Sequence, residues 1–138
     1  MVAKKKVDNN IQTVGRRKTS IARCNMKKGT GIIRINGLDL EEVVNNSVMQ
    51  LRVLEPLILS DMQSKIDLNI SLNGGGVNSQ VDALRQAIAR GIVEMLGEDT
   101  KKKFAEYDRT LIVSDTRFKE TKKPNNSHAR AKRQKSYR

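Results

Sequence analysis

The alternation of apolar and polar positions predicts a β-hairpin in the N-terminal part of the chain. Residues 20–27 alternate small apolar with polar side chains, 28–31 reads Lys-Gly-Thr-Gly, and 32–36 is a second short apolar run. This order of strand, glycine-containing turn and strand is typical of a hairpin. Arg23 and Arg34 fall on polar positions, so both strands are expected to carry cations on one face.

Two short helices are predicted after Gly37, which ends the second strand. Residues 40–44 can form one helical turn, and a second helix is expected to begin at Ser47. It should carry the apolar residues Val48, Met49, Leu51 and Leu54 and stop at Pro56.

The clearest strand pattern covers residues 65–73, where Ile66, Leu68, Ile70 and Leu72 alternate with polar residues. A run of three glycines, 74–76, then ends the strand.

The main helix of the core is predicted directly after the glycines. Ser79 and Asp82 have the spacing of a capping box, and Gly97 is expected to end the helix. Its apolar stripe consists of Val81, Leu84, Ile88, Ile92 and Met95.

One more helix is predicted over residues 101–107, followed by an apolar segment at 111–113. The order of these elements indicates an α+β domain, with a sheet covered by helices on one face. The length of 138 residues and the apolar share of 37% suffice for one modest core but not for two.

Charge is distributed unevenly along the chain, whose formal net charge is +12. Residues 1–18 hold six cations and one acid, residues 117–138 hold nine cations and one acid, and residues 19–116 hold 12 cations and 13 acids. We therefore expect a basic N-terminal extension (1–14), a globular RNA-binding body (15–116) and an extended basic tail (117–138). Such arms have too few apolar residues to order alone, so they should order on a polyanion.

Several function classes are disfavoured by composition. Two Phe, two Tyr and no Trp leave little for base stacking, and the longest aliphatic run, 57–59, is far short of the roughly 20 residues of a membrane span. We therefore expect a soluble protein with no membrane partner. One cysteine allows no internal disulfide, which fits a reducing cytosol.

No cofactor, metal or catalytic centre is predicted. Cys24 and His128 would have to be rigidly adjacent to form a nucleophile pair, and one lies in a strand and the other in the tail. The acids Asp39, Glu41 and Glu42 suit the first turn of a helix better than a metal site.

The glycines Gly74, Gly75 and Gly76 leave alternatives open. A tight strand-to-helix turn is favoured, a contact with an RNA phosphate at the helix N-terminus comes second, and a nucleotide pocket is least supported because the P-loop Lys-Ser/Thr pair is missing.

The basic cluster Gly15-Arg-Arg-Lys-Thr-Ser20 favours a clamp on phosphates over a merely solubilising run, because arginine forks match phosphate oxygens. The nine tail cations predict binding with a log–log salt slope of roughly −6 on single strands.

Four segments, taken in order and spacing, resemble one known family: GRRKTSIAR at 15–23, GTGIIRING at 29–37, LNGGGVNSQVDALRQAIAR at 72–90, and EYDRTLIVSDTRFKETKK at 106–123 leading into ARAKRQKSYR at 129–138. The family is that of the universal small-ribosomal-subunit protein number nine, called number sixteen in eukaryotic nomenclature. The LEPLIL segment at 54–59 and the QKSYR ending are similar to its archaeal and eukaryotic cytosolic branch.

The resemblance implies a two-layer fold, with helices on one face of a mixed four-stranded sheet and a left-handed βαβ crossover. It implies a non-enzymatic role in translation, in the head of the small subunit of cytosolic ribosomes. The implied partners are ribosomal RNA, neighbouring head proteins and the peptidyl-site transfer RNA. Members of this branch usually have GGPGAR where this chain has residues 124–130, and Asn tolerates left-handed backbone angles well enough to keep that path.

The resemblance and the charge pattern together give two sets of expected contacts. The transfer RNA set, at the anticodon stem-loop, is Lys135, Tyr137 and Arg138. The ribosomal RNA set is Arg16, Arg17, Lys18, Arg23, Gly74, Gly75, Gly76, Arg117, Lys122, Lys123, Arg130, Lys132 and Arg133. The competing hypotheses are a basic subunit of a ribonuclease and a nucleic-acid chaperone without a fixed site.

Overall fold

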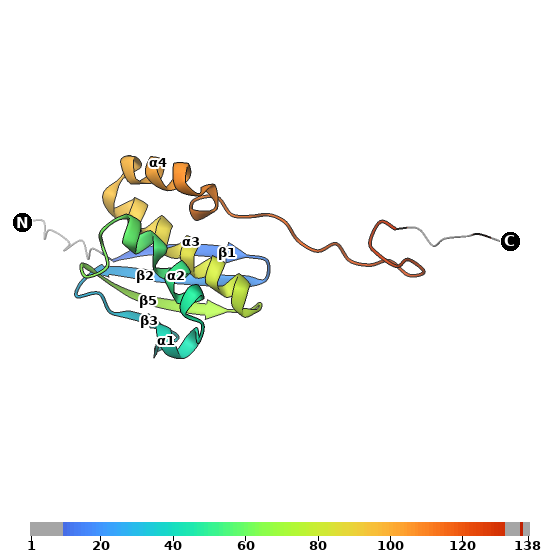
Figure 1. Cartoon of the computed structure of the whole chain (residues 1–138), viewed down its shortest axis with the longest axis horizontal. Helices are drawn as coiled ribbons and strands as arrows, with labels where there is room; N and C mark the ends of the chain where they lie inside the picture. The colour runs from blue at the N-terminus through green and yellow to red at the C-terminus, as the bar shows by residue number, and fades with distance from the viewer. Residues whose placement is uncertain (1–9, 132–135, 137–138) are drawn as a thin grey trace, which may run out of the picture.

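The computed structural model describes residues 10–131 and 136, and it has an α+β architecture with one mixed sheet (Figure 1). The sheet has five strands in the order β1-β2-β5-β3-β4. The strands are β1 (Ile11–Arg17), β2 (Ser20–Lys28), β3 (Ile33–Ile35), β4 (Leu38–Asp39) and β5 (Ile66–Asn73). The helices are α1 (Leu40–Val43), α2 (Ser47–Leu59), α3 (Val77–Leu96), α4 (Glu98–Tyr107) and the 3-10 turn η1 (Arg109–Leu111).

The predicted hairpin between residues 20 and 36 is wrong. β2 pairs antiparallel with β1 on one side and with β5 on the other, whereas β3 pairs in parallel with β5. β5 therefore lies between the two strands that the local turn pattern joined. β2 and β5 form a ladder of eight residue pairs, whereas β3 has only three residues to offer. The longer ladder provides more cross-strand side-chain pairs, so β2 pairs with β5 and not with β3.

The hairpin that does form joins β1 to β2, and β1 begins at Ile11, inside the range assigned to the basic extension. A second hairpin joins β3 to β4 through Asn36 and Gly37, whose φ angles of 53° and 85° suit a two-residue turn. β4 is only two residues long, and it raises the strand number from the expected four to five.

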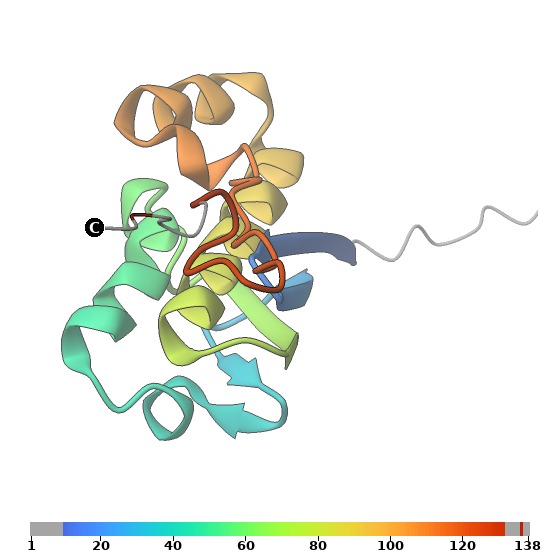
Figure 2. The same cartoon turned by 90° about the vertical axis from the view of Figure 1, so that its right-hand side faces the viewer.

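The core lies between one face of the sheet and the helices α2 and α3, as the end-on view of Figure 2 makes clear. Val81, Leu84, Ile88 and Ile92 of the predicted stripe are buried, and Met95 packs against the same core. The predicted end at Gly97 is confirmed. The predicted capping box is wrong by one turn, because α3 begins at Val77 and Ser79 itself bonds back to Gly76.

α2 begins at Ser47 as predicted but continues through Pro56 to Leu59. Pro56 removes one backbone hydrogen bond, yet its ring and Leu57 are buried in the core, and this burial offsets the loss. The buried face of α2 is accordingly Val53, Pro56 and Leu57, while Val48 and Leu51 are exposed.

The C-terminal part of the body consists of α4, which begins three residues before the predicted helix, and η1. From residue 114 to 131 the described chain has no helix or strand, and it extends away from the body (Figure 1). Within the described residues, no helix combines the length and apolar character that crossing a membrane requires.

Candidate nucleic-acid interface

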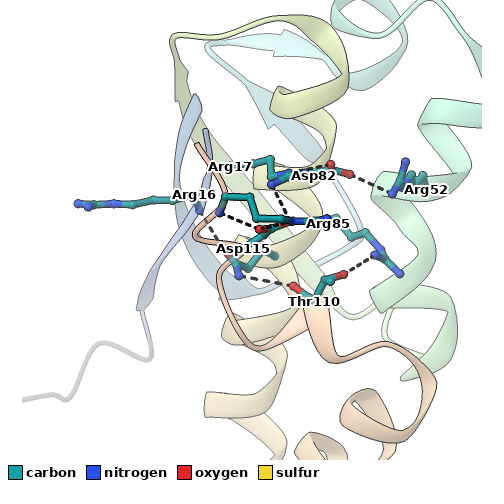
Figure 3. A pocket seen from close by; sticks show the side chains of 9 residues that line it. Arg16, Arg17, Arg52, Asp82, Arg85, Thr110 and Asp115 are labelled. Atoms are coloured by element: carbon teal, nitrogen blue, oxygen red, sulfur yellow. Dashed lines mark hydrogen bonds and ion pairs between the residues drawn. The ribbon is translucent and has the colours of Figure 1, made fainter. Parts of the chain in front are cut away.

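The basic cluster predicted from sequence forms the turn between β1 and β2. Arg17 pairs with Ser20 in the last rung of the ladder, so Lys18 and Thr19 make the turn, and Lys18 adopts a left-handed φ of 51°. Because neighbouring strand residues point to opposite faces, Arg16 and Arg17 diverge. Arg16 extends outward to solvent, whereas Arg17 points toward the helices (Figure 3).

The glycine turn lies directly beside this hairpin end. Gly74 and Gly75 have φ angles of 76° and 71°, and a Cβ at Gly74 would lie 2.5 Å from the carbonyl oxygen of Thr19. A Cβ at Gly75 would overlap the hydroxyl of Ser20, which donates a 3.0 Å hydrogen bond to the Gly74 carbonyl oxygen. A tight turn packed on neighbouring backbone thus accounts for both glycines. Gly76 faces open space, and RNA contact at all three glycines stays a prediction.

Arg17 occupies a cavity of about 140 Å³ between β1, α3 and the start of the tail (Figure 3). Its Nη1 lies 2.7 Å from Asp115 Oδ2 and its Nε lies 3.5 Å from Asp82 Oδ2. The Nη1 contact has the geometry of an ion pair without a directed hydrogen bond. Only 20% of the Arg17 side chain is exposed, so the predicted phosphate ligand already has carboxylate partners within the protein.

Asp115 joins the hairpin to the tail, because it also binds Arg117. The Arg117 Nη2 lies 2.6 Å from Asp115 Oδ2, and the Arg117 backbone N–H donates to Oδ1 at 2.9 Å. The Arg117 side chain, followed by its N–H and by the charge of Arg17, holds the pKa of Asp115 well below its usual range. The carboxylate therefore stays charged at neutral pH, and it keeps Arg17 and Arg117 side by side.

Polar side chains of α3 fix the segment from which the tail departs. Arg85 is 7% exposed, and it donates to Glu55 on α2 at 2.5 Å and to Asp108 at 2.6 Å. Arg90 donates to the carbonyl oxygens of Val14, at 2.7 Å, and of Ile112, at 2.9 Å. Strand β1, helix α2 and residues 108–112 are thus all tied to one helix.

Gln86 adds a direct link between the hairpin and the tail. Its Oε1 accepts from the backbone N–H of Arg16 at 2.8 Å and from the hydroxyl of Ser114 at 3.3 Å. Sequence reasoning missed these residues of α3. The available signal was the presence of Arg85, Gln86 and Arg90 in the stretch 83–92 of α3, which is otherwise buried and apolar.

Cations of the basic hairpin cluster and of the basic tail converge at this end of the molecule. An open hollow of about 590 Å³ is lined by Arg17, Lys18 and Thr19 of the hairpin and by Arg117, Phe118 and Lys119 of the tail. Arg117 is 83% exposed, so its guanidinium can meet a ligand while one edge binds Asp115. The structure therefore brings Arg17, Lys18 and Arg117 together, whereas the Arg16 side chain extends from the opposite face of β1.

The other predicted residues lie elsewhere. Arg23 is exposed on the face of the sheet that points away from α3, and Lys122 and Lys123 are exposed in the tail. Arg130 binds Glu120 with its Nη2 2.5 Å from Oε1, which closes a loop where Asn125 takes a left-handed φ of 63°. Lys132, Arg133, Lys135, Tyr137 and Arg138 lie outside the described residues.

The two groups considered for nucleophilic chemistry are apart. Cys24 is buried in the core, and burial raises the pKa of its thiol to about 12, while His128 is exposed in the tail. Among the residues described, no three His, Cys, Asp or Glu side chains are grouped closely enough to hold a metal ion.

Comparison with known proteins places the chain in one family. The family model described as ribosomal protein S9/S16 matches residues 15–138. The small ribosomal subunit protein uS9 of Thermoplasma volcanium is 50% identical over 130 residues, which cover 93% of this chain and 98% of that protein. The uS9 proteins of Methanococcus maripaludis and Methanothrix thermoacetophila are 48% and 46% identical, with the same two shares of coverage. These relatives are archaeal, and the family is one of structural proteins, not of enzymes. The chain belongs to the ribosomal protein S9/S16 family.

Proposed function

We propose that this protein is a structural component of the small ribosomal subunit that binds ribosomal RNA at the hairpin end of its sheet and along its tail. The observation that carries the proposal is the convergence of Lys18, Arg117 and Lys119 where the tail leaves the body. Guanidinium and ammonium groups gathered at one place, with exposed tips, match the closely spaced phosphates of a folded RNA.

Arg16 and Lys18 are the better candidates for direct phosphate contact at the hairpin. Both are exposed, and Arg16 extends away from the cavity that holds Arg17 (Figure 3). Arg17 has two carboxylate neighbours, so its role is to hold the hairpin against Asp115 and Asp82 and thereby to orient the cations beside it.

The tail extends this surface toward transfer RNA. Lys135, Tyr137 and Arg138 match the family ending, and we propose that they contact the anticodon stem-loop of the peptidyl-site transfer RNA. Contacts of this kind act on the phosphate backbone that all transfer RNAs share, so one tail can serve every codon. The head of the subunit, with neighbouring head proteins as partners, in cytosolic ribosomes, is the proposed location.

The connection from β3 to β5 belongs to the same proposal. These parallel strands are adjacent, and α1 and α2 lie between them in the chain. We propose the left-handed crossover that the resemblance implies, against the usual preference.

Removal of residues 135–138 tests the tail. Subunits reconstituted with the shortened chain should sediment as 30S-type particles after a high-salt wash, while filter binding of initiator transfer RNA to the peptidyl site weakens. Unchanged transfer RNA binding would overturn the tail role.

Arg16→Glu tests the RNA clamp in the body. Incorporation into subunits should fall, because the reversed charge meets phosphate without disturbing an internal ion pair. Lys102→Glu, which makes the same change of charge at an exposed position of α4, is the matched control and should incorporate normally. Undiminished incorporation of Arg16→Glu would contradict the clamp. Comigration with a catalytic RNA, or loss from subunits in high salt, would instead support the ribonuclease-subunit or chaperone hypotheses.

A further inference from the structure

The face of the sheet that points away from the helices is polar and cationic. Figures 1 and 2 show α2 and α3 on the opposite face, and no described element covers this one. We call it the open face. Its outward residues include Arg16, Arg23, Lys27 and Arg34, all exposed, against two acids, Asp67 and Asp39, the latter directly opposite Arg34 in the pairing of β3 with β4. The prediction that Arg23 and Arg34 lie on one face is confirmed, although their strands, β2 and β3, are not paired with each other.

The body is nearly neutral as a whole, but its sheet side is positively charged and its helix side is negatively charged. The segments 10–36 and 62–76, which carry β1, β2, β3 and β5, hold eight cations and one acid. The segments 37–61 and 77–116, which carry the helices and the two-residue strand β4 with Asp39, hold seven cations and twelve acids. A polyanion is therefore attracted to the sheet side and repelled from the helix side.

One of the two acids on the open face, Asp67, is already engaged by the backbone, and the other, Asp39, lies opposite Arg34 without forming an ion pair with it. The Oδ1 of Asp67 accepts the backbone N–H groups of Thr30, Gly31 and Ile32 at 2.8, 2.9 and 3.0 Å. By contrast, Arg16, Arg23 and Arg34 form no ion pair with any residue in the described part of the chain. A polyanion can therefore bind these three arginines without first displacing a carboxylate in the described part of the chain.

The register places amide side chains between these cations. Gln12 pairs with Asn25, Asn25 with Asn69, and Asn69 with Arg34, so the four residues form one row across four strands. At about 4.8 Å per strand, the row is about 14 Å long. Val14, Arg23 and Ser71 form the next row on the same face.

We infer that the open face binds double-stranded RNA across its shallow minor groove, which deepens the proposed RNA-binding function and rests on it. The A-form minor groove is wide and shallow and displays 2′-hydroxyl groups, which amides can recognise as donors and acceptors. The cations around the amide row meet the phosphates that border the groove.

The alternatives within nucleic acids fit less well. A single strand is held by stacking its bases on aromatic side chains, and the outward positions of β1, β2, β3 and β5 carry none. The minor groove of B-form DNA is only about 6 Å wide, and its major groove admits a helix or a ribbon of two strands, not the face of a sheet.

Binding of the full-length chain to a 16-base-pair RNA duplex, measured by fluorescence anisotropy, tests the inference. Arg23→Glu combined with Arg34→Glu should weaken duplex binding by roughly tenfold or more, because two phosphate contacts become repulsive. The control, Lys102→Glu with Lys103→Glu on α4, changes the net charge equally and should weaken binding less than threefold.

Substitutions of the amide side chains distinguish specific recognition of duplex RNA from nonspecific electrostatic attraction to phosphates. Asn25→Ala combined with Asn69→Ala should reduce the preference for duplex RNA over a DNA duplex of the same sequence, while the salt slope stays unchanged, because amides release no counterions. Thermal melting of each variant verifies that it is folded.

The outcomes distinguish the inference from the proposed function. If the wild-type chain binds no RNA, both fail. If it binds RNA and the two Arg substitutions have no more effect than the α4 control, or if they weaken single-stranded RNA and duplex RNA equally, the inference alone is overturned.

Discussion

Gly15 on β1 lies against the backbone of Ala83 on α3 so closely that a Cβ at Gly15 would overlap the Ala83 carbonyl oxygen. The same Cβ would lie 2.6 Å from the backbone nitrogen of Ala87. Next to it, the hydroxyl of Thr13 donates a 2.7 Å hydrogen bond to the Ala87 carbonyl oxygen. The strand that leads into the basic hairpin is thus in direct backbone contact with the central helix.

Gly15→Ala is therefore expected to destabilise the fold by about 3 kcal/mol, at the upper end for overpacked sites, because the clashing atoms belong to backbone that cannot rotate away. Urea unfolding measures the loss. Gly76→Ala is the control, since nothing lies within 4 Å of a Cβ there, and its effect should stay below about 1 kcal/mol. Equal effects at the two positions would contradict the close approach.

Removal of the Arg85 side chain should cost about 3 kcal/mol, because it leaves the carboxylates of Glu55 and Asp108 together without their cation. Both carboxylates are partly exposed, which keeps the loss at the low end for buried pairs. Arg52→Ala, which removes an exposed partner of Asp82, should cost less than about 1 kcal/mol. Chemical denaturation of the two variants tests the difference, and a comparable loss in both would argue against Arg85 as the central tie.

The stability of the loop over residues 29–32 should depend on pH through Asp67. The N–H groups of Ile32 and Thr30, with that of Gly31, lower the pKa of this carboxyl. A lowered pKa in the folded state means that the stabilisation is complete above the unfolded pKa, near 4, and is lost as the pH falls through the folded value.

Asp67→Asn should accordingly flatten the decline in the urea midpoint between neutral pH and pH 3. Glu94→Gln, an exposed change on α3, should leave the decline as in the wild type. A wild-type decline that persists in Asp67→Asn would assign the acid sensitivity to other carboxyls.

Cys24 provides a reporter of global unfolding. It is 1% exposed, and burial raises its pKa to about 12, so the native protein should contain almost no reactive thiolate at pH 8. Labelling by iodoacetamide should therefore follow unfolding, and its rate in the Gly15→Ala and Arg85→Ala variants should rise about tenfold for each 1.4 kcal/mol of lost stability. Fast labelling of the wild type would show that the β2 side of the core opens locally.

Local pattern predicted the elements whose burial follows a regular period. The strand over 66–73 and the stripe of α3 alternate or repeat cleanly, so the sequence alone identified them. β1 was not predicted, because its buried positions Thr13 and Gly15 are not apolar. Hydrophobicity therefore does not alternate with a period of two along this strand. The false hairpin followed from a strong turn signal at 28–31, which cannot reveal that β5, far along the chain, pairs with both strands.

The candidate site was predicted in part for the same reason. Charge alone predicted that the cations of the hairpin and the tail bind nucleic acid, which stays a prediction, and the structure brings Lys18 and Arg117 to one hollow. The internal partner of Arg17 could not be predicted, because Asp115 is almost a hundred residues away in sequence. Partners at such separation depend on how α3 packs, and no local pattern contains that information.

The ties from Arg85, Gln86 and Arg90 to residues 108–114 also bear on how the tail searches for its target. With its root fixed to the body, the twenty residues from 119 to 138 can reach at most about 70 Å from their anchor. Once the body has docked, the tip encounters its target as a tethered ligand, at an effective concentration that can approach the millimolar range. If the tip binds transfer RNA as proposed, individually weak contacts can then be occupied most of the time and still exchange rapidly.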